Sequence, residues 1–156
     1  MNPVEIGQEV SSFSAKATSD SIFNLADYKG KSHLVIYFYP KDSTPGCTTE
    51  GKNFRDLYAE FQALDTEIVG VSRDSIKRHE NFKKKHAFPF ELITDESGDI
   101  CQLFGVWQLK KLFGKEYKGI VRSTFLIDKQ GILRNQWLNV RVKGHADEVL
   151  QAVKAL

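Results

Sequence analysis

Hydrophobic residues recur along the chain with two spacings, one typical of strands and one typical of helices. The β-branched and aromatic run at 34–39 is short and predicts a buried strand. Apolar side chains then recur every three or four positions between Phe54 and Leu64, which predicts a helix over 45–63. The residues 40–44 connect the two elements. We expect the rest of the chain to be arranged around this strand, loop and helix.

The same patterns predict the remaining elements. Residues 12–24 alternate loosely around a Ser-Asp turn, which indicates a small hairpin, and residues 25–30 indicate one helical turn ended by a glycine. Further strands are predicted at 67–71, 90–94, 124–127 and 132–138. Further helices are predicted from Ser75 to about His86, around Ile100–Phe104, and from Gly144 onward.

Two of these segments carry many charges. In the helix capped by Ser75, we expect Ile76 and Phe82 to face the interior and the run of lysine and histidine residues to face water. The segment 108–119 contains four lysines and is expected to be a solvated loop. Binding of an anionic ligand or partner by this segment is the alternative.

Strands that alternate with helices, followed by a hairpin and a last helix, predict an α/β fold. The central sheet is expected to be mixed, mostly parallel and flanked by helices, together with an N-terminal β-hairpin. This order of elements resembles the thioredoxin fold. A chain of 156 residues without repeats, linkers or low-complexity segments indicates a single domain over 1–156. Open α/β sheets carry their sites at the carboxyl ends of strands, which is where the loop 40–44 begins.

The composition excludes several classes of protein. Hydrophobic content of 41% and charged content of 27% are ordinary for a globular domain. The net charge of +2 is too small to indicate binding to nucleic acid or to a membrane surface. No apolar run approaches the roughly 20 residues of a membrane helix, and the first seven residues contain neither a basic leader nor an apolar signal core. The expected compartment is the cytoplasm.

The chain has two cysteines, Cys47 and Cys101, far apart in the sequence. Their spacing does not resemble a zinc site, and the four histidines are scattered without a ligand pair, so neither a metal nor a cofactor is expected. In a reducing cytoplasm, two distant cysteines give poor support for a structural disulfide. Cys101 is interpreted as a small buried hydrophobe. The proline, glycine and threonine residues around Cys47 argue against that interpretation there.

The predicted helix places Cys47 in its first turn. Thr44 can cap this helix, and Pro45 suits its first position because the N–H that proline lacks would be unpaired there. Free N–H groups and the positive end of the helix dipole favour a thiolate, which is the reactive form of cysteine. Glycines at positions 46 and 51 would make this first turn easier to unwind.

The neighbours of Cys47 narrow its chemistry. Disulfide exchange of the Cys-x-x-Cys kind would need a second cysteine where Glu50 stands. A cysteine hydrolase would need a histidine base, and no histidine adjoins a motif of that kind, although a spatial neighbour stays open. Direct reaction of a thiolate with a peroxide needs no separate base and gives a sulfenic acid.

Residues 40–47, Pro-Lys-Asp-Ser-Thr-Pro-Gly-Cys, contain the Pro-x-x-x-Thr-x-x-Cys signature of peroxiredoxins. The longer run Phe38–Thr48 resembles the bacterioferritin comigratory protein subfamily, also called peroxiredoxin Q. The similarity continues in order over nearly the whole chain, in the blocks Gly70–Asp74, Gly105–Trp107, Gly119–Asp128 and Val142–Ala146. The resemblance implies a thioredoxin-fold domain of the alkyl hydroperoxide reductase/thiol-specific antioxidant type over 1–156.

The resemblance also implies roles for individual residues. Cys47 would attack the peroxide O–O bond, and Thr44 would hydrogen-bond the peroxide. Arg122 would hold the thiolate and the substrate oxygen, and Pro40 would shield the thiolate from water. Two further residues have an alternative of equal weight: Glu50 could bond Arg122 or lie on the helix surface, and Trp107 could wall the pocket or simply pack.

The sequence departs from the family at the position of the resolving cysteine. Many relatives carry it where this chain has Lys52, and others carry it where this chain has Lys83. Cys101 belongs to a helix face expected to be half-buried, where some relatives have a cysteine that does not resolve; a resolving role for it is the alternative. The favoured hypothesis is a one-cysteine peroxidase acting on hydrogen peroxide and organic hydroperoxides. An external thiol such as thioredoxin, glutaredoxin or glutathione would then reduce Cys47.

Other outcomes stay open at this stage. An intermolecular Cys47–Cys47 disulfide would need an exposed site in a suitable dimer, whereas relatives imply a monomer. The protein could instead be a peroxide-responsive signalling or holdase protein, in which oxidation changes partner binding. It could also be a binding module with an inert thiol, which would ionise like a free cysteine.

Overall fold

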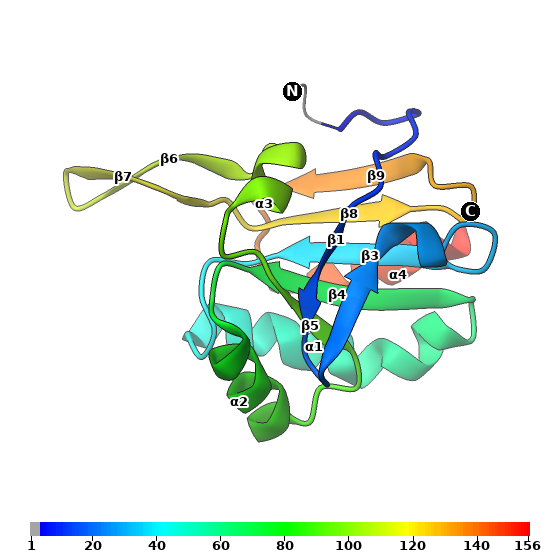
Figure 1. The fold of residues 1–156 in the computed structure, drawn as a ribbon, viewed down its shortest axis with the longest axis horizontal. Coiled ribbons are helices and arrows are strands. Elements are labelled where there is room, and N and C mark those ends of the chain that lie inside the picture. The colour runs from blue at the N-terminus through cyan, green and yellow to red at the C-terminus, as the bar shows by residue number, and fades with distance from the viewer. Residues whose placement is uncertain (1–3) are drawn as a thin grey trace.

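The computed structural model describes residues 4–156 and has a seven-stranded sheet at its centre (Figure 1). The strands lie in the order β2-β1-β5-β4-β3-β8-β9. Their bounds are Ser14–Ala17 (β1), Ser21–Asn24 (β2), His33–Phe38 (β3), Thr66–Ser72 (β4), Glu91–Thr94 (β5), Ser123–Ile127 (β8) and Leu133–Leu138 (β9). Residues 1–3, part of the segment expected to carry no leader, lie outside the described residues.

The helices agree with the sequence predictions to within a few residues. They are the 3-10 turn η1 and four α-helices: Leu25–Asp27 (η1), Pro45–Gln62 (α1), Ile76–His86 (α2), Asp99–Leu103 (α3) and His145–Lys154 (α4). Ser75 caps α2 as expected, because its hydroxyl accepts a hydrogen bond from the N–H of Arg78 at 3.3 Å. Within residues 4–156, no helix is both long enough and apolar enough to cross a membrane.

The sheet divides the core into two clusters. Successive residues of β3 point to opposite faces, as the period of a strand requires. Leu34, Ile36 and Phe38 belong to the cluster that contains Ile100 and Cys101 from α3. Val35 and Tyr37 belong to the other cluster, whose helical members come from α1, α2 and α4: Cys47, Phe54, Phe61, Phe82, Ala146, Val149, Leu150 and Val153. Helices therefore cover both faces, as predicted.

The mixed sheet is confirmed, but its expected parallel majority holds only at the centre. Among the described strands, β3 pairs with β4 and β4 with β5 in parallel, whereas the other pairs in this sheet are antiparallel. The physical reason is that each flank is a hairpin, β1–β2 or β8–β9, whose two strands must be antiparallel. The inner strand of each hairpin also runs antiparallel to the central strand that it joins, β1 to β5 and β8 to β3.

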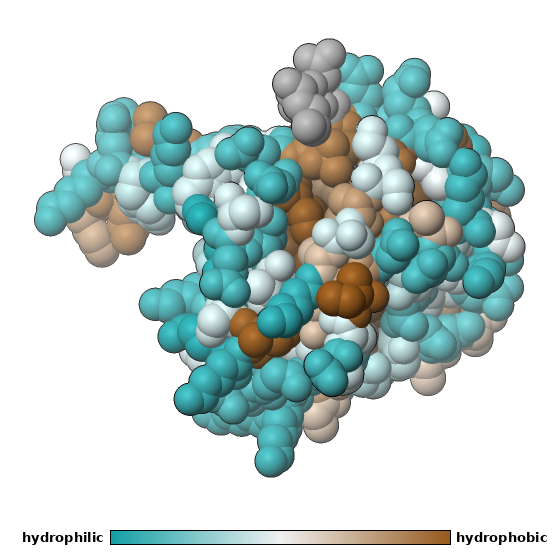
Figure 2. All heavy atoms as spheres, in the orientation of Figure 1, coloured by the Kyte–Doolittle hydropathy of each residue, from teal (hydrophilic) through white to brown (hydrophobic). Residues whose placement is uncertain are grey.

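The prediction of a solvated loop over 108–119 is wrong. Strands β6 (Trp107–Leu112) and β7 (Lys115–Ile120) form a separate antiparallel hairpin, which projects from the body as an arm (Figure 1). Phe113 and Gly114 both have positive φ, 52° and 76°, which suits the tight turn of a hairpin. Most arm residues are exposed, so burial imposes little strand alternation on the sequence. Figure 2 shows hydrophobic side chains near its tip, where Phe113 is 95% exposed.

Candidate active site

The nucleophile candidate Cys47 lies in the first turn of α1, just beyond the carboxyl end of β3, and is 2% exposed. Pro45 occupies one of the first helical positions, as predicted. Thr44 is the N-cap residue by backbone geometry, but its side chain makes no capping hydrogen bond. Its hydroxyl instead donates to the carbonyl oxygen of Lys41 at 2.8 Å, so the expected side-chain cap is wrong. The Thr44 oxygen keeps its lone pairs for a further donor.

Arg122 reaches Cys47 from the two-residue connection between β7 and β8. One guanidinium nitrogen, Nη2, lies 3.3 Å from the Cys47 sulfur, and the other, Nη1, donates to Glu50 at 2.6 Å. Glu50 and Cys47 are three residues apart on α1 and so share one helix face. A Cβ atom at Gly46 would lie 3.2 Å from Nη2, so this glycine leaves room for the guanidinium. The structure thus brings together the predicted residues Cys47, Arg122 and Glu50.

Glu50 is buried, not on the helix surface as one of its two predicted readings held. Its carboxylate is 1% exposed, and burial raises its pKa from 4.5 to about 7, although the charge of Arg122 and the hydrogen bond with it act in the opposite direction. Burial lowers the pKa of Arg122, but the charges of Glu50 and Cys47 outweigh burial and leave that pKa raised. The arginine therefore remains a fixed positive charge beside the sulfur.

Two buried polar atoms near the thiol have no hydrogen-bond partner within residues 4–156. They are Glu50 Oε2 and the hydroxyl oxygen of Tyr37. Burial, then the charges of Glu50 and Cys47, raise the pKa of Tyr37, so its hydroxyl stays protonated. The inner side of the site is therefore deeply buried, and Cys47, Glu50 and Tyr37 are all at most 2% exposed. The charge of Arg122 acts more strongly on the sulfur there than it would in water.

The raised pKa of Glu50 gives a prediction for stability. Because the folded state binds this proton more tightly than the unfolded state, the stabilisation is complete below pH 4.5 and is lost as the pH rises through about 7. Between these limits, the wild-type chain should lose up to about 3 kcal/mol of stability relative to Glu50→Gln. Urea unfolding of both chains at several pH values measures this difference. Parallel stability profiles for the two chains would contradict it.

An open groove leads to this site from the arm. One part, of about 400 Å³, is lined by Pro40, Trp107 and residues of the arm, and an adjoining part of about 440 Å³ is lined by Pro40, Arg122 and Val140. Trp107 packs under Arg73, whose guanidinium carbon lies 4.6 Å from the ring centroid. The structure therefore places Pro40 in both parts of the groove, beside Arg122 in the second, and Trp107 in the wall of the first.

Cys101 lies on the other side of the sheet from Cys47. It is completely buried and belongs to the other core cluster, which confirms its interpretation as a small buried hydrophobe. Its helix face, with Ile100 and Phe104, is buried as well, so the expected half-buried face is wrong. Burial and the carboxylate of Asp95 raise the pKa of its thiol, which disfavours the reactive form. A Cys47–Cys101 disulfide would need the two Cα atoms within about 7 Å. The sheet between the two cysteines prevents this in the folded chain.

The two positions where the resemblance implied a resolving cysteine are occupied by lysines, one on α1 and one on α2. Lys52 is exposed, and Lys83 forms an ion pair with Glu91. No thiol other than those of Cys47 and Cys101 exists in the chain.

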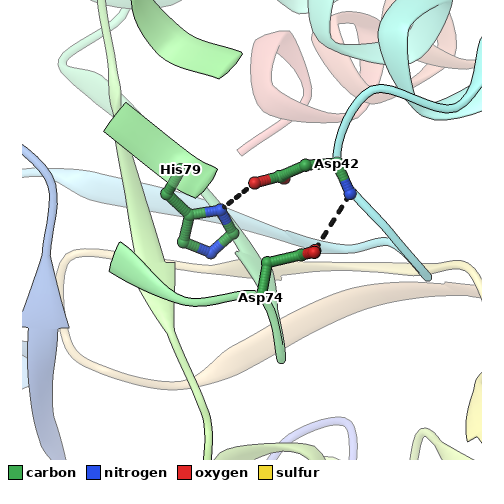
Figure 3. Close-up of side chains that lie close together, drawn as sticks. All are labelled: Asp42, Asp74 and His79. Carbon is green, nitrogen blue, oxygen red and sulfur yellow. Dashed lines mark hydrogen bonds and ion pairs between the residues drawn. The ribbon is translucent and has the colours of Figure 1, made fainter. Parts of the chain in front are cut away.

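Sequence reasoning missed one buried cluster beside the site. His79 was expected to face water, but it is completely buried and lies with Asp42 and Asp74 (Figure 3). The expectation that the histidines of this helix face water is therefore wrong for His79. A signal was present, because His79 lies three residues after Ile76 and three before Phe82, on one helix face. The burial of Asp42 was not visible in the pattern.

The comparisons with known proteins agree with this geometry. The profile described as the AhpC/TSA family matches residues 6–136. The peroxiredoxin Bcp of Bacillus subtilis is 52% identical over 151 residues, which are 97% of this chain and 96% of that protein. The peroxiredoxin Bcp of Escherichia coli is 35% identical over 154 residues, 99% of this chain and 98% of that protein.

Solved structures extend the likeness to the fold. A cysteine-to-serine mutant of a Xylella fastidiosa peroxiredoxin Q has a TM-score of 0.93 and 37% identity, covering 99% of this chain and 98% of that one. A structure of the Xanthomonas campestris bacterioferritin comigratory protein, described for its alkyl peroxide reduction activity, has a TM-score of 0.87 and 45% identity, covering 92% and 90%. These neighbours confirm the predicted thioredoxin-like fold.

Two further Xanthomonas campestris structures bear on the lysines. They are serine mutants of two different cysteines of one peroxiredoxin Q, and the two cysteines are separated by as many residues as Cys47 and Lys83 are in this chain.

Family profile, relatives and structures agree over almost the entire length. The chain therefore belongs to the AhpC/TSA family and is, within it, a thiol peroxidase of the peroxiredoxin type that includes the bacterioferritin comigratory proteins.

Proposed function

We propose that this chain reduces hydrogen peroxide and organic hydroperoxides through a sulfenic acid on Cys47, with an external thiol as reductant. In the first step the thiolate sulfur attacks one peroxide oxygen, an S–O bond forms and the O–O bond breaks. The departing oxygen takes a proton and leaves as water or an alcohol. The observation that carries the proposal is the 3.3 Å contact between Arg122 Nη2 and the Cys47 sulfur.

The charge that develops during this step would be stabilised by groups already in place. Arg122 supplies a fixed positive charge, and the N–H of Cys47 lies at the start of α1, where main-chain donors are free. The hydroxyl of Thr44 donates to Lys41, so its oxygen would accept a hydrogen bond from the proton of the peroxide. Pro40, which lines the groove together with Arg122, would limit the access of water to the thiolate.

The second step would need another molecule. A first external thiol attacks the sulfenic sulfur, releases water and forms a mixed disulfide, and a second thiol then frees Cys47 as a thiolate. This division of the cycle is supported by Lys52, by Lys83 and by the position of Cys101 across the sheet. Thioredoxin, glutaredoxin and glutathione are the thiols that we propose as reductants.

The reductant would reach Cys47 only after a local opening, because the sulfur is buried. Gly46 and Gly51 were expected to ease the unwinding of the first turn. The structure gives another reason for each glycine, because a larger side chain would collide with a neighbour. A Cβ at Gly51 would lie 2.5 Å from Phe88, just as one at Gly46 would crowd Arg122. The opening that we propose is therefore not explained by these glycines alone.

The cellular setting of this cycle is also a proposal. We infer a single catalytic domain over 1–156, working as a monomer in the cytoplasm, as an antioxidant in redox homeostasis. A cycle that consumes external thiols is supported by a compartment whose thiols are kept reduced. Size-exclusion chromatography of the reduced protein would test the monomer.

The test is peroxide consumption by the purified chain with each reductant system in turn. We expect catalytic turnover of hydrogen peroxide and of cumene hydroperoxide with at least one of them, and none when the thiol is omitted. If Cys47 is oxidised but not turned over by any thiol, a signalling or holdase role replaces the proposal. Pull-down from oxidised and reduced samples would then identify a partner bound only after oxidation.

A further inference from the structure

The loop between β3 and α1 is held by hydrogen bonds within it and by groups from outside it. Ser43 has a φ of 65°, a left-handed conformation that is uncommon for residues other than glycine. Asp42, next to it, is 2% exposed and is the buried anchor of the loop. Its N–H donates to Asp74 at 2.9 Å, and its carboxylate accepts from the hydroxyl of Tyr39 at 2.6 Å.

The second carboxylate oxygen of Asp42 lies 2.6 Å from Nδ1 of His79, which reaches it from α2 (Figure 3). The other ring nitrogen, Nε2, lies 3.0 Å from the carbonyl oxygen of Ile93. A carbonyl oxygen can only accept, so Nε2 carries a hydrogen atom. One further proton must lie between Nδ1 and the carboxylate, and it makes the pair neutral overall whichever atom carries it.

The hydroxyl of Tyr39 completes the arrangement. Burial, then the charge of Asp42, raise the pKa of Tyr39, so the hydroxyl stays protonated and acts as a donor. Both oxygens of Asp42 are therefore bonded, one to Tyr39 and one to His79. A buried polar network with every member paired fixes geometry, because any displacement leaves a group unpaired.

The cluster also contains Asp74, and three such groups could be read as ligands for a cation. Their atoms are already engaged, however. Asp74 accepts from Ser72 and from the Asp42 N–H through one oxygen, and from Arg78 through the other. Together with the two bonded nitrogens of His79, these contacts describe a hydrogen-bond junction between α2, β4 and the loop.

Building on the proposed peroxidase function, we propose that His79 is a positioning residue for that reaction, which holds Asp42 and through it the loop carrying Pro40 and Thr44. The thiol is then fixed from two directions. Arg122 and Glu50 hold the sulfur side of the first turn, and His79 holds the loop that leads into it. Because α2 is a separate helix, its contact with the loop sets how easily the site opens.

This role predicts a split between the two half-reactions. A loosened loop misplaces the groups around the peroxide, and a small misplacement can cost up to about 100-fold in rate. The same loosening leaves the sulfenic sulfur no less accessible to a thiol. In His79→Leu we therefore expect the rate constant for oxidation of Cys47 by hydrogen peroxide to fall at least about tenfold. The rate constant for reduction of the sulfenic acid by dithiothreitol should not fall.

His86→Leu is the matched control, because His86 lies on the same helix and has no hydrogen bond to the loop. Tyr39→Phe is the milder variant, because it removes only the hydroxyl that donates to Asp42; it should slow oxidation several-fold. Both half-reactions are measured in single turnovers, at a temperature where circular dichroism shows the variants folded. If His79→Leu does not fold, Tyr39→Phe decides.

The results that overturn the proposal are distinct from those that overturn the peroxidase function. Oxidation of His79→Leu as fast as that of His86→Leu, or a parallel fall in both half-reactions, removes the positioning role. An unchanged Tyr39→Phe removes it as well. A wild-type chain that hydrogen peroxide does not oxidise at Cys47 overturns the function itself, and the positioning role with it.

Discussion

Replacing Cys47 by serine is expected to abolish peroxide reduction, whereas replacing Cys101 by serine should leave it within about twofold of the wild-type rate. A serine hydroxyl cannot replace the thiolate, since it is not ionised at neutral pH and forms no sulfenic acid. Cys101 is completely buried in the core cluster on the other face of the sheet and so cannot meet Cys47. The measurement is peroxide consumption with a saturating thiol.

The two variants control for each other, since each changes one sulfur to oxygen in a buried position. Turnover retained by Cys47→Ser would remove the nucleophile from the account. Turnover lost in a folded Cys101→Ser would mean that a second cysteine takes part, against the one-cysteine proposal. Unfolding by urea separates that result from a simple loss of stability.

Replacing Arg122 by lysine is expected to lower the second-order rate constant with hydrogen peroxide by about 100-fold or more. The guanidinium donates to the sulfur of Cys47 and to Glu50 at once, through two different nitrogens. An ammonium group keeps the charge but is a compact donor without this fixed fork, so it cannot span both partners. Stopped-flow or competition measurements of Cys47 oxidation give the rate constant.

Arg134→Lys is the control for this prediction. Arg134 is also paired with a buried carboxylate, that of Asp128, but it lies on β9 and does not contact Cys47. Cys47 of the Arg134→Lys variant should be oxidised at the wild-type rate. If the rate constant of Arg122→Lys stays within threefold of the wild-type value, the positive charge alone is sufficient and the two-nitrogen geometry is not required.

Much of the fold could be predicted because side chains that pack in the core recur with the period of their strand or helix. The run at 34–39 and the face from Phe54 to Leu64 both contain side chains that pack in the core, and both elements appear within a residue or two of their predicted bounds. The arm was missed for the converse reason. Most side chains of strands β6 and β7 are exposed, so packing does not select alternating hydrophobic and polar residues there. The lysine-rich sequence that results is also typical of a loop.

The site was predicted to the extent that its residues belong to a motif. Cys47, Thr44 and Pro40 follow from the local signature, and Arg122 from the resemblance of its surrounding block; the structure then brings Arg122 to the sulfur. Glu50 and His79 are different, because charged or titratable residues are usually exposed. Only three-dimensional partners, Arg122 for Glu50 and Asp42 for His79, explain why they are buried.

The most direct test of the central claim is the intact mass of the reduced chain after one equivalent of hydrogen peroxide, without any thiol. The account predicts a gain of one oxygen atom, located on Cys47 by peptide mapping after trapping with dimedone, because the chain holds no thiol that can reach this sulfur. A loss of two hydrogen atoms from a monomer would instead show a Cys47–Cys101 disulfide. That result would contradict both the separation of the two cysteines by the sheet and the need for an external reductant.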